Sequence, residues 1–159
     1  MYEAYKNRIF SLCVKLTGSR PDAEDLFGET WLRIAEKHRN LQTDKNPVNW
    51  MYAVCVNLYR KSYAKSRRKG IQIKDSETVL RGIQSAENVE ENIAASEEVF
   101  KLRGAIRKLD DKYRVPLILF YFREESYKDI TQIMKLPMST VKYRIYQAKA
   151  ILRKEMEEY

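Results

Sequence analysis

Apolar residues recur along this chain at intervals of three and four positions, the period of an α-helix, and strand-like alternation is absent. Ile9, Leu12, Cys13 and Leu16 follow this spacing and predict a first helix over about residues 2–16. Glycine and proline occur mainly between such stretches, where they interrupt helices. The pattern therefore predicts an all-α protein.

Capping residues and breaks place the other predicted helices. Pro21 fits the first turn of a second helix, which begins with Ser19 or Arg20 as its cap and runs to about Lys37. The polar segment 38–49 is predicted as a loop. Further helices are predicted at about residues 50–65, 99–109, 112–122 and 126–135, and Ser126 caps the last of these. A final helix is predicted to follow the Leu-Pro-Met sequence at 136–138.

The final predicted helix has two unlike faces. Its apolar stripe consists of Val141, Ile145, Ala148 and Leu152. Cations, hydroxyls and tyrosines lie opposite, and no acid occurs between Ser139 and Lys154. A solvated face more often pairs Glu with Lys one turn apart, whereas these groups donate to phosphates and contact bases. Two short helices at a tight turn, the second one basic, indicate a helix-turn-helix.

Charge divides the chain into three parts. The 159 residues include 30 Lys and Arg against 22 Asp and Glu, for a formal net charge of +8. Residues 1–70 and 99–159 are basic, whereas residues 71–98 are acidic and polar. We therefore predict two small helical domains, 1–70 and 99–159, joined by a flexible acidic linker over 71–98. The basic balance favours a polyanionic partner, either nucleic acid or an acidic membrane surface.

Composition weighs against several other classes of protein. No apolar run approaches the roughly 20 residues of a membrane span, so no membrane insertion is expected, and the start lacks the layout of a secretory signal, so we expect a cytoplasmic protein. One histidine, His38, and two distant cysteines, Cys13 and Cys55, nearly exclude a zinc site. The cysteines are predicted as small buried hydrophobes. Without a glycine-rich phosphate loop or convergent acids, neither a cofactor nor an enzyme is predicted.

Three segments of the chain, taken in order, resemble a known family. They are DAEDLFGETWLRIAEK (22–37), NPVNWMYAVCVNLYRKSYAKSRRK (46–69) and SYKDITQIMKLPMSTVKYRIYQAKAILRKEM (126–156). Together they resemble bacterial RNA polymerase sigma factors of the extracytoplasmic-function (ECF) group of the sigma-70 family. The resemblance implies a sigma region 2-like domain over 1–70 and a region 4-like domain over 99–159. It also implies a protein that binds core RNA polymerase and directs it to promoter DNA, without catalysing a bond change.

The resemblance also assigns roles to residues. It implies that the helix over 22–37 docks on the coiled coil of the polymerase clamp, that the helix before residue 70 holds the unpaired minus-10 strand, and that the last helix reads the minus-35 duplex. The residues implied for polymerase are Asp22, Asp25, Leu26 and Glu29. Those for the minus-10 strand are Asn57, which would face a flipped base, and Arg60, Lys61, Lys65, Arg67 and Arg68. Those for the minus-35 duplex are Ser126, Ser139, Thr140, Lys142, Tyr143, Arg144, Tyr146 and Gln147.

Some assignments have ordinary structural alternatives. Asp22 and Asp25 also suit the positive N-terminus of a helix, although Glu29, two turns in, does not. Cations at 65–69 also suit a helix end, and Trp50 is better explained as a core anchor than as a base-stacking residue. An anti-sigma factor is an expected partner, and we hypothesise that the linker closes the free protein. A plain solvated tether is the alternative.

Departures from the family pattern mark three further positions. Lys135 occupies a turn position that is usually glycine, so a left-handed backbone there would be strained. Gly28 replaces a usual glutamine and weakens its helix by up to about 1 kcal/mol. Phe120 replaces an arginine, for which Arg123 is the expected substitute. Two rival functions remain: a free-standing helix-turn-helix regulator, and a nucleic-acid-modifying enzyme.

Overall fold

The computed structural model describes residues 2–37, 46–65, 67 and 96–157, and these residues form helices without any strand. The prediction of an all-α protein is therefore confirmed. The helices are α1 (Tyr2–Thr17), α2 (Arg20–Lys37), α3 (Pro47–Ser62), α7 (Glu97–Lys108), α8 (Asp111–Leu117), a π-helical continuation η2 (Ile118–Phe122), α9 (Tyr127–Met134) and α10 (Met138–Glu157).

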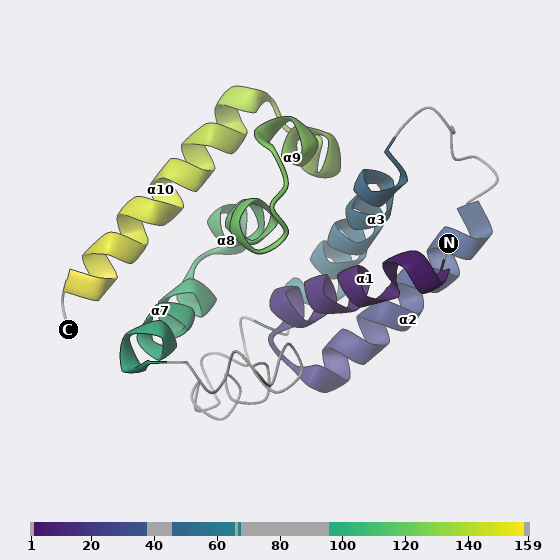
Figure 1. Cartoon of the computed structure of the whole chain (residues 1–159), viewed down its shortest axis with the longest axis horizontal. Coiled ribbons are helices and arrows are strands. Elements are labelled where there is room, and N and C mark those ends of the chain that lie inside the picture. The colour runs from purple at the N-terminus through teal and green to yellow at the C-terminus, as the bar shows by residue number, and fades with distance from the viewer. Residues whose placement is uncertain (1, 38–45, 66, 68–95, 158–159) are drawn as a thin grey trace.

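The helices form two groups that pack directly against each other (Figure 1). Helices α1, α2 and α3 contact one another in the first group, and α10 contacts α7, α8 and α9 in the second. Helices α8 and α9 lie between α10 and the first group, with α9 packed on α3. The predicted linker lies almost wholly outside the described residues. The contact between the two groups that the structure describes is made by their own helices.

Local capping explains where several helices begin. The Asn46 side chain accepts a hydrogen bond from the Val48 N–H at 3.0 Å, and Pro47 occupies the first helical position. Helix α3 therefore begins at Pro47, earlier than the start near residue 50 that the sequence predicted. At α9 the prediction for Ser126 is confirmed, because its hydroxyl accepts from the Asp129 N–H at 3.1 Å in a capping box.

The apolar stripes are buried as predicted. Val141, Ile145, Ala148 and Leu152 of α10 face the core, as do Ile9, Leu12, Cys13 and Leu16 of α1. Cys13 and Cys55 are free buried thiols whose sulfurs lie 3.6 Å apart, although 42 positions separate them in the sequence. The contact with Cys55, together with burial, raises the pKa of Cys13 strongly, so this thiol stays protonated.

The turn between α9 and α10 has the strained backbone expected from the sequence. Lys135 takes the left-handed conformation with φ 56° and ψ 47°, and its N–H donates to the Thr131 carbonyl. A side chain in this region costs about 1–2 kcal/mol, which glycine avoids. The helix-turn-helix keeps its tight turn in spite of that cost.

Alanine substitution at two glycines, which differ in backbone conformation, tests how that conformation affects the stability of the fold. Gly28 lies exposed inside α2, and a Cβ added there would meet nothing within 4 Å. Gly28→Ala should therefore stabilise the fold by about 1 kcal/mol, raising Tm by about 2–4 °C. Gly18 has φ +72°, and a Cβ there would overlap the Arg107 guanidinium, so Gly18→Ala should lower Tm. Thermal denaturation followed by circular dichroism measures both, and shifts of the same sign would contradict this account.

Candidate nucleic-acid interface

Asp22, Asp25 and Glu29 lie on one face of α2, as their spacing in the sequence suggested. We call this the acidic face of α2. Asp25 and Glu29 are exposed, whereas Leu26 is fully buried and anchors the helix. The Tyr63 hydroxyl donates to Glu29 at 2.9 Å. Partial burial raises the pKa of Tyr63, and the hydrogen bond to Glu29 and the negative charges of Glu29, Asp25 and Asp22 raise it further. Sequence reasoning missed Tyr63, because its partners come from another helix.

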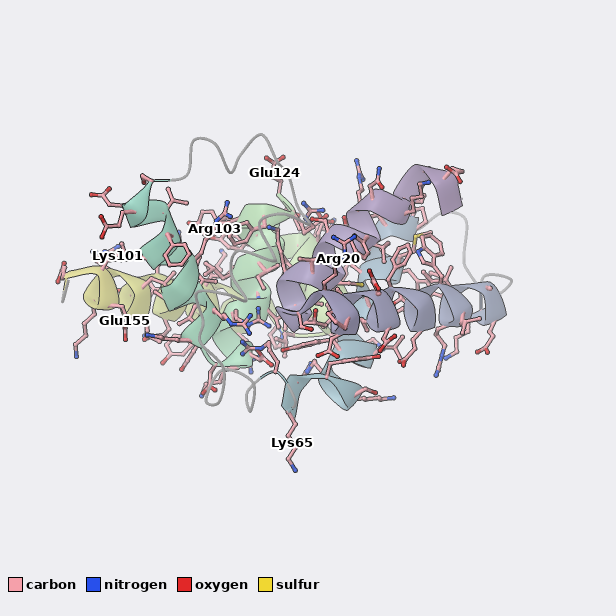
Figure 2. All side chains as sticks on the ribbon, turned by 90° about the horizontal axis from the view of Figure 1, so that it is seen from below. Arg20, Lys65, Lys101, Arg103, Glu124 and Glu155 are labelled. Atoms are coloured by element: carbon pink, nitrogen blue, oxygen red, sulfur yellow. The ribbon has the colours of Figure 1, made fainter. Side chains whose placement is uncertain are left out.

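Helix α3 and the turn after it expose most of the predicted minus-10 residues. Asn57 and Lys61 lie one turn apart on the exposed side, next to Arg60. Figure 2 shows Lys65 extending away from the body of the protein. Trp50 is half-buried and packs against the core, as the structural alternative predicted. Arg68 lies outside the described residues.

The outward face of α10 is polar and aromatic. Tyr143 and Tyr146 are 58% and 68% exposed and lie on the same side of the helix, three positions apart. Ser139 and Lys142 are exposed beside them, and Thr140, Arg144 and Gln147 are half-buried. The Lys142 ammonium lies 5.7 Å from the centre of the Tyr127 ring, a contact that joins the two helices of the helix-turn-helix.

Ser126 is already engaged within its own helix cap. Its hydroxyl donates to the Asp129 carboxylate at 2.8 Å, and its backbone N–H donates to the same oxygen at 3.2 Å. A phosphate at this helix end would have to replace Asp129. The structure therefore gives Ser126 a capping role in addition to the predicted phosphate contact.

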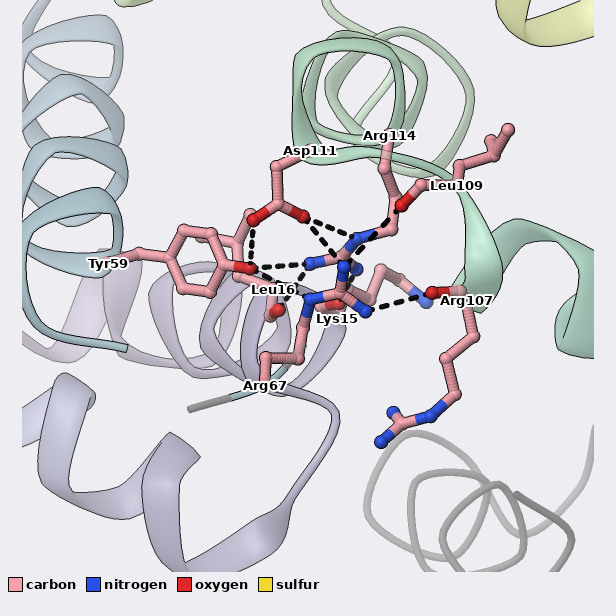
Figure 3. A network of polar contacts seen from close by, with 8 residues as sticks. All are labelled: Lys15, Leu16, Tyr59, Arg67, Arg107, Leu109, Asp111 and Arg114. Atoms are coloured by element: carbon pink, nitrogen blue, oxygen red, sulfur yellow. Dashed lines mark hydrogen bonds and ion pairs between the residues drawn. The ribbon is translucent and has the colours of Figure 1, made fainter. Parts of the chain in front are cut away.

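Arg67, predicted for the minus-10 strand, points inward. It is 4% exposed and belongs to what we call the arginine network: Tyr59, Arg67, Arg107, Asp111 and Arg114 (Figure 3). Its guanidinium donates to Asp111 at 2.9 Å, to the Tyr59 hydroxyl at 2.9 Å and to the Arg107 carbonyl at 2.9 Å. In this arrangement Arg67 is not available to DNA.

Arg114 is the centre of the arginine network. It is 3% exposed and donates to Asp111 at 3.1 Å and to the Tyr59 hydroxyl at 3.0 Å. It also donates to the carbonyls of Lys15 and Leu16 at the end of α1. Arg107 donates to the nearby Gly18 carbonyl at 3.2 Å. Arginines of the second helix group thus cap the C-terminal carbonyls of a helix in the first.

The arginine network holds three cations and one carboxylate. Burial alone would raise the pKa of Asp111, but Arg114, Arg67 and the Tyr59 hydrogen bond together hold it below its ordinary value. Burial lowers the pKa of Arg107 to about 10, and repulsion from Arg67 and Arg114 contributes to the shift. Asp111 is therefore charged at neutral pH and offsets repulsion between the Arg67 and Arg114 guanidinium groups.

A second polar contact joins the two helix groups at α9. The Asn49 side-chain amide, on α3, donates to Asp129 at 2.8 Å and to Gln132 at 3.0 Å. Asn49 is buried, and its amide hydrogen bond is the leading cause that lowers the pKa of Asp129. The same carboxylate therefore caps α9 and holds it against α3.

A helix-turn-helix in an all-α chain with exposed cations on α3 and α10 is typical of a DNA-binding transcription factor. A family model for Sigma-70 region 2 matches residues 1–69, and one for Sigma-70, region 4 matches residues 100–152. The chain belongs to the sigma-70 family, in its ECF group, and is an RNA polymerase sigma factor for transcription initiation.

Relatives and a solved structure agree with this assignment. The ECF RNA polymerase sigma factors SigW and SigM of Bacillus subtilis are each 27% identical, covering 98% and 96% of this chain and 87% and 91% of their own lengths. The fold resembles that of sigma factor RpoE, crystallised with the anti-sigma factor NepR from Bartonella quintana. The TM-score is 0.72 at 18% identity, over 98% of this chain and 94% of that one. No helix among the described residues is long and apolar enough to cross a membrane.

Proposed function

We propose that this sigma factor uses three separate surfaces, one for core RNA polymerase and two for promoter DNA. Residues 1–70 dock on the polymerase clamp and hold the minus-10 strand, and residues 99–159 bind the minus-35 duplex. The protein acts in the bacterial cytoplasm and catalyses no bond change itself. The observation that carries this proposal is the separation of an exposed acidic face on α2 from exposed cationic faces on α3 and α10.

The acidic face suits a protein partner with a basic surface. Asp25 and Glu29 are exposed while Leu26 is buried beneath them, so the helix is rigidly held and its acids point outward. Fixed charges of one sign steer a partner of the opposite sign and set its orientation. We assign this face, with Asp22 at its edge, to the coiled coil of the polymerase clamp.

The exposed side of α3 suits an unpaired strand. Holding a base out of the stack requires a polar group that reads its edge and cations that follow the backbone. Asn57 provides the amide, and Arg60, Lys61 and Lys65 provide cations along the same part of the chain. The α10 face suits duplex DNA instead, because a helix of its kind enters the major groove with hydroxyl, amide and ammonium donors.

Regulation by an anti-sigma factor is part of the proposal. The similar crystal structure contains one bound to its sigma factor. An apolar groove of about 410 Å³ on the second helix group, between α7, η2 and α10, supports such a protein contact. Its lining includes Leu102, Ile106, Tyr121 and Leu152.

The polymerase assignment predicts the effect of charge reversal on α2. Asp25→Lys with Glu29→Lys should abolish co-purification with core polymerase, because the face would then repel a basic partner, while helicity and Tm change little. Glu3→Lys with Glu24→Lys is the matched control, since both acids are exposed and lie on other faces. Wild-type polymerase affinity in the Asp25/Glu29 variant would place docking elsewhere.

The two DNA contacts should be separable. Lys142→Ala or Tyr146→Ala should weaken binding to a minus-35 duplex by about 1–3 kcal/mol, whereas Lys154→Ala, near the end of α10, should not. Asn57→Ala should leave duplex binding intact and reduce promoter opening, seen as lost permanganate reactivity of unpaired thymines. Asn7→Ala, exposed on α1, is its control.

Run-off transcription with core polymerase tests the function as a whole. Transcription from a promoter should require both core polymerase and this protein. A free-standing regulator would bind duplex DNA but would not support initiation with core polymerase. Loss of duplex binding in Asn57→Ala would contradict the division between the two DNA contacts.

A further inference from the structure

Three aromatic rings meet where the π-helical segment η2 approaches the start of α9. The rings of Phe120 and Tyr127 are stacked, with their centres 4.8 Å apart and their planes 5° from parallel. The ring of Tyr121 is nearly perpendicular to that of Phe120, with centres 4.8 Å apart, and Tyr121 is 49% exposed. A π-helical segment is rare and often occurs at a functional site. We call these three residues the aromatic stack.

Two lysines of α10 lie over the rings of the aromatic stack. The Lys142 ammonium is 5.7 Å from the centre of the Tyr127 ring. The Lys149 ammonium is 5.8 Å from the centre of the Phe120 ring and 5.1 Å from that of Tyr121. These distances fall within the range of about 6 Å over which a ring face attracts a cation. About two turns separate the lysines, or roughly 10 Å along the axis, so both lie on one side of α10.

An aromatic ring restrains a cation without cancelling its charge. Among the residues that the structure describes, neither Lys142 nor Lys149 makes an ion pair. A neighbouring carboxylate would restrain the ammonium but would also compete with a phosphate for it, whereas a ring leaves the positive charge in place. A lysine stem is flexible, and ordering it opposes binding. The aromatic stack thus restrains two cations that keep their full charge.

The aromatic stack lies where the family pattern has an arginine. Phe120 replaces that arginine, and the sequence predicted Arg123 as its substitute. In the structure the Arg123 guanidinium donates to the Phe122 carbonyl at 2.9 Å and to the Arg8 carbonyl of α1 at 3.4 Å. Lys149, in contrast, holds its ammonium over the Phe120 ring itself. A cation therefore lies beside position 120, although it comes from another helix.

We propose that Phe120 and Tyr127 are positioning residues for the minus-35 duplex, and that Lys149, held over the aromatic stack, contacts a phosphate in place of the arginine that Phe120 replaces. This inference rests on the proposed assignment of the α10 face to that duplex. Residues near the start of a recognition helix reach base edges, and residues further along approach the backbone. The stack therefore directs Lys142 toward the bases and Lys149 toward the backbone.

The first experiment separates the ring of Tyr127 from its hydroxyl group. Holoenzyme made from core polymerase and the full chain is titrated with a labelled duplex that carries the minus-35 element of a promoter it transcribes. Tyr127→Leu removes the ring face and should lower affinity about 2- to 5-fold. Tyr127→Phe keeps the ring and should bind like the wild type.

A second tyrosine supplies the matched control. The Lys112 ammonium lies 5.0 Å from the centre of the Tyr113 ring on α8, outside the α10 face, so Tyr113→Leu should not change affinity. Wild-type affinity in Tyr127→Leu would overturn the positioning role. An equal loss in Tyr127→Leu and Tyr127→Phe would also overturn it, because the hydroxyl group rather than the ring would then carry the effect.

The salt dependence of binding tests the phosphate contact of Lys149. Lys149→Ala should reduce the slope of log K against log salt by about 1, whereas Lys154→Ala, exposed near the end of α10, should not change it. Phe120→Leu removes the ring beneath Lys149, so Lys149→Ala should cost less affinity in that background than in the wild type. Additive losses from the two substitutions would overturn the coupling.

Restoring an arginine tests the replacement directly. Adding Phe120→Arg to the Lys149→Ala protein should recover the affinity and salt slope of the wild type, because a guanidinium then supplies the phosphate contact. A double variant that binds no better than Lys149→Ala alone would overturn the replacement. Absence of duplex binding by the wild-type holoenzyme would instead contradict the proposed function.

Both positioning residues also pack against the core, so each variant needs a measure of its fold. Circular dichroism should show wild-type helicity for every variant that is compared. Because Phe120 and Tyr127 belong to different helices, a loss of helicity on substituting one residue leaves the other to decide the positioning role. A change in salt slope at constant helicity distinguishes a restrained phosphate contact from a purely structural contribution of the rings.

Discussion

Arg114 sets the main constraint on this structure, because a buried guanidinium must find hydrogen-bond acceptors for its donors. Its acceptors come from both halves of the chain: Asp111 on its own helix, the Tyr59 hydroxyl on α3, and the carbonyls that end α1. Neither half alone can provide this set. The burial of one cation therefore fixes how the two helix groups are placed relative to each other.

The polar contacts at the junction lie beside buried apolar residues of both helix groups, which belong to one hydrophobic cluster. Buried ion pairs contribute less to stability than their geometry suggests, since desolvation offsets the attraction. The polar contacts thus fix the relative orientation of the two groups, while the burial of apolar residues drives their association.

Periodicity and capping in the sequence were enough to predict most of the helices and the buried stripe of α10, because both depend on residues within a few positions. The junction could not be predicted in this way. Arg114 and its acceptor Lys15 are separated by 99 positions, and nothing near Arg114 in the sequence marks it as buried. Arg67 lies in a run of cations, and a local pattern of that kind indicates solvent or phosphate rather than a core. The contact of Cys13 with Cys55 was missed for the same reason.

The choice of arginine at the junction follows from its geometry. Arg67 donates to a carboxylate, a hydroxyl and a carbonyl at once, and a planar guanidinium with five donors can do so without distortion. The compact ammonium of lysine has three donors and holds its hydration more tightly, so burying it at the same place would satisfy fewer acceptors. The Nη2 of Arg67 donates to Asp111, its Nε to the Tyr59 hydroxyl and its Nη1 to the Arg107 carbonyl, so all three nitrogens are used inside the protein.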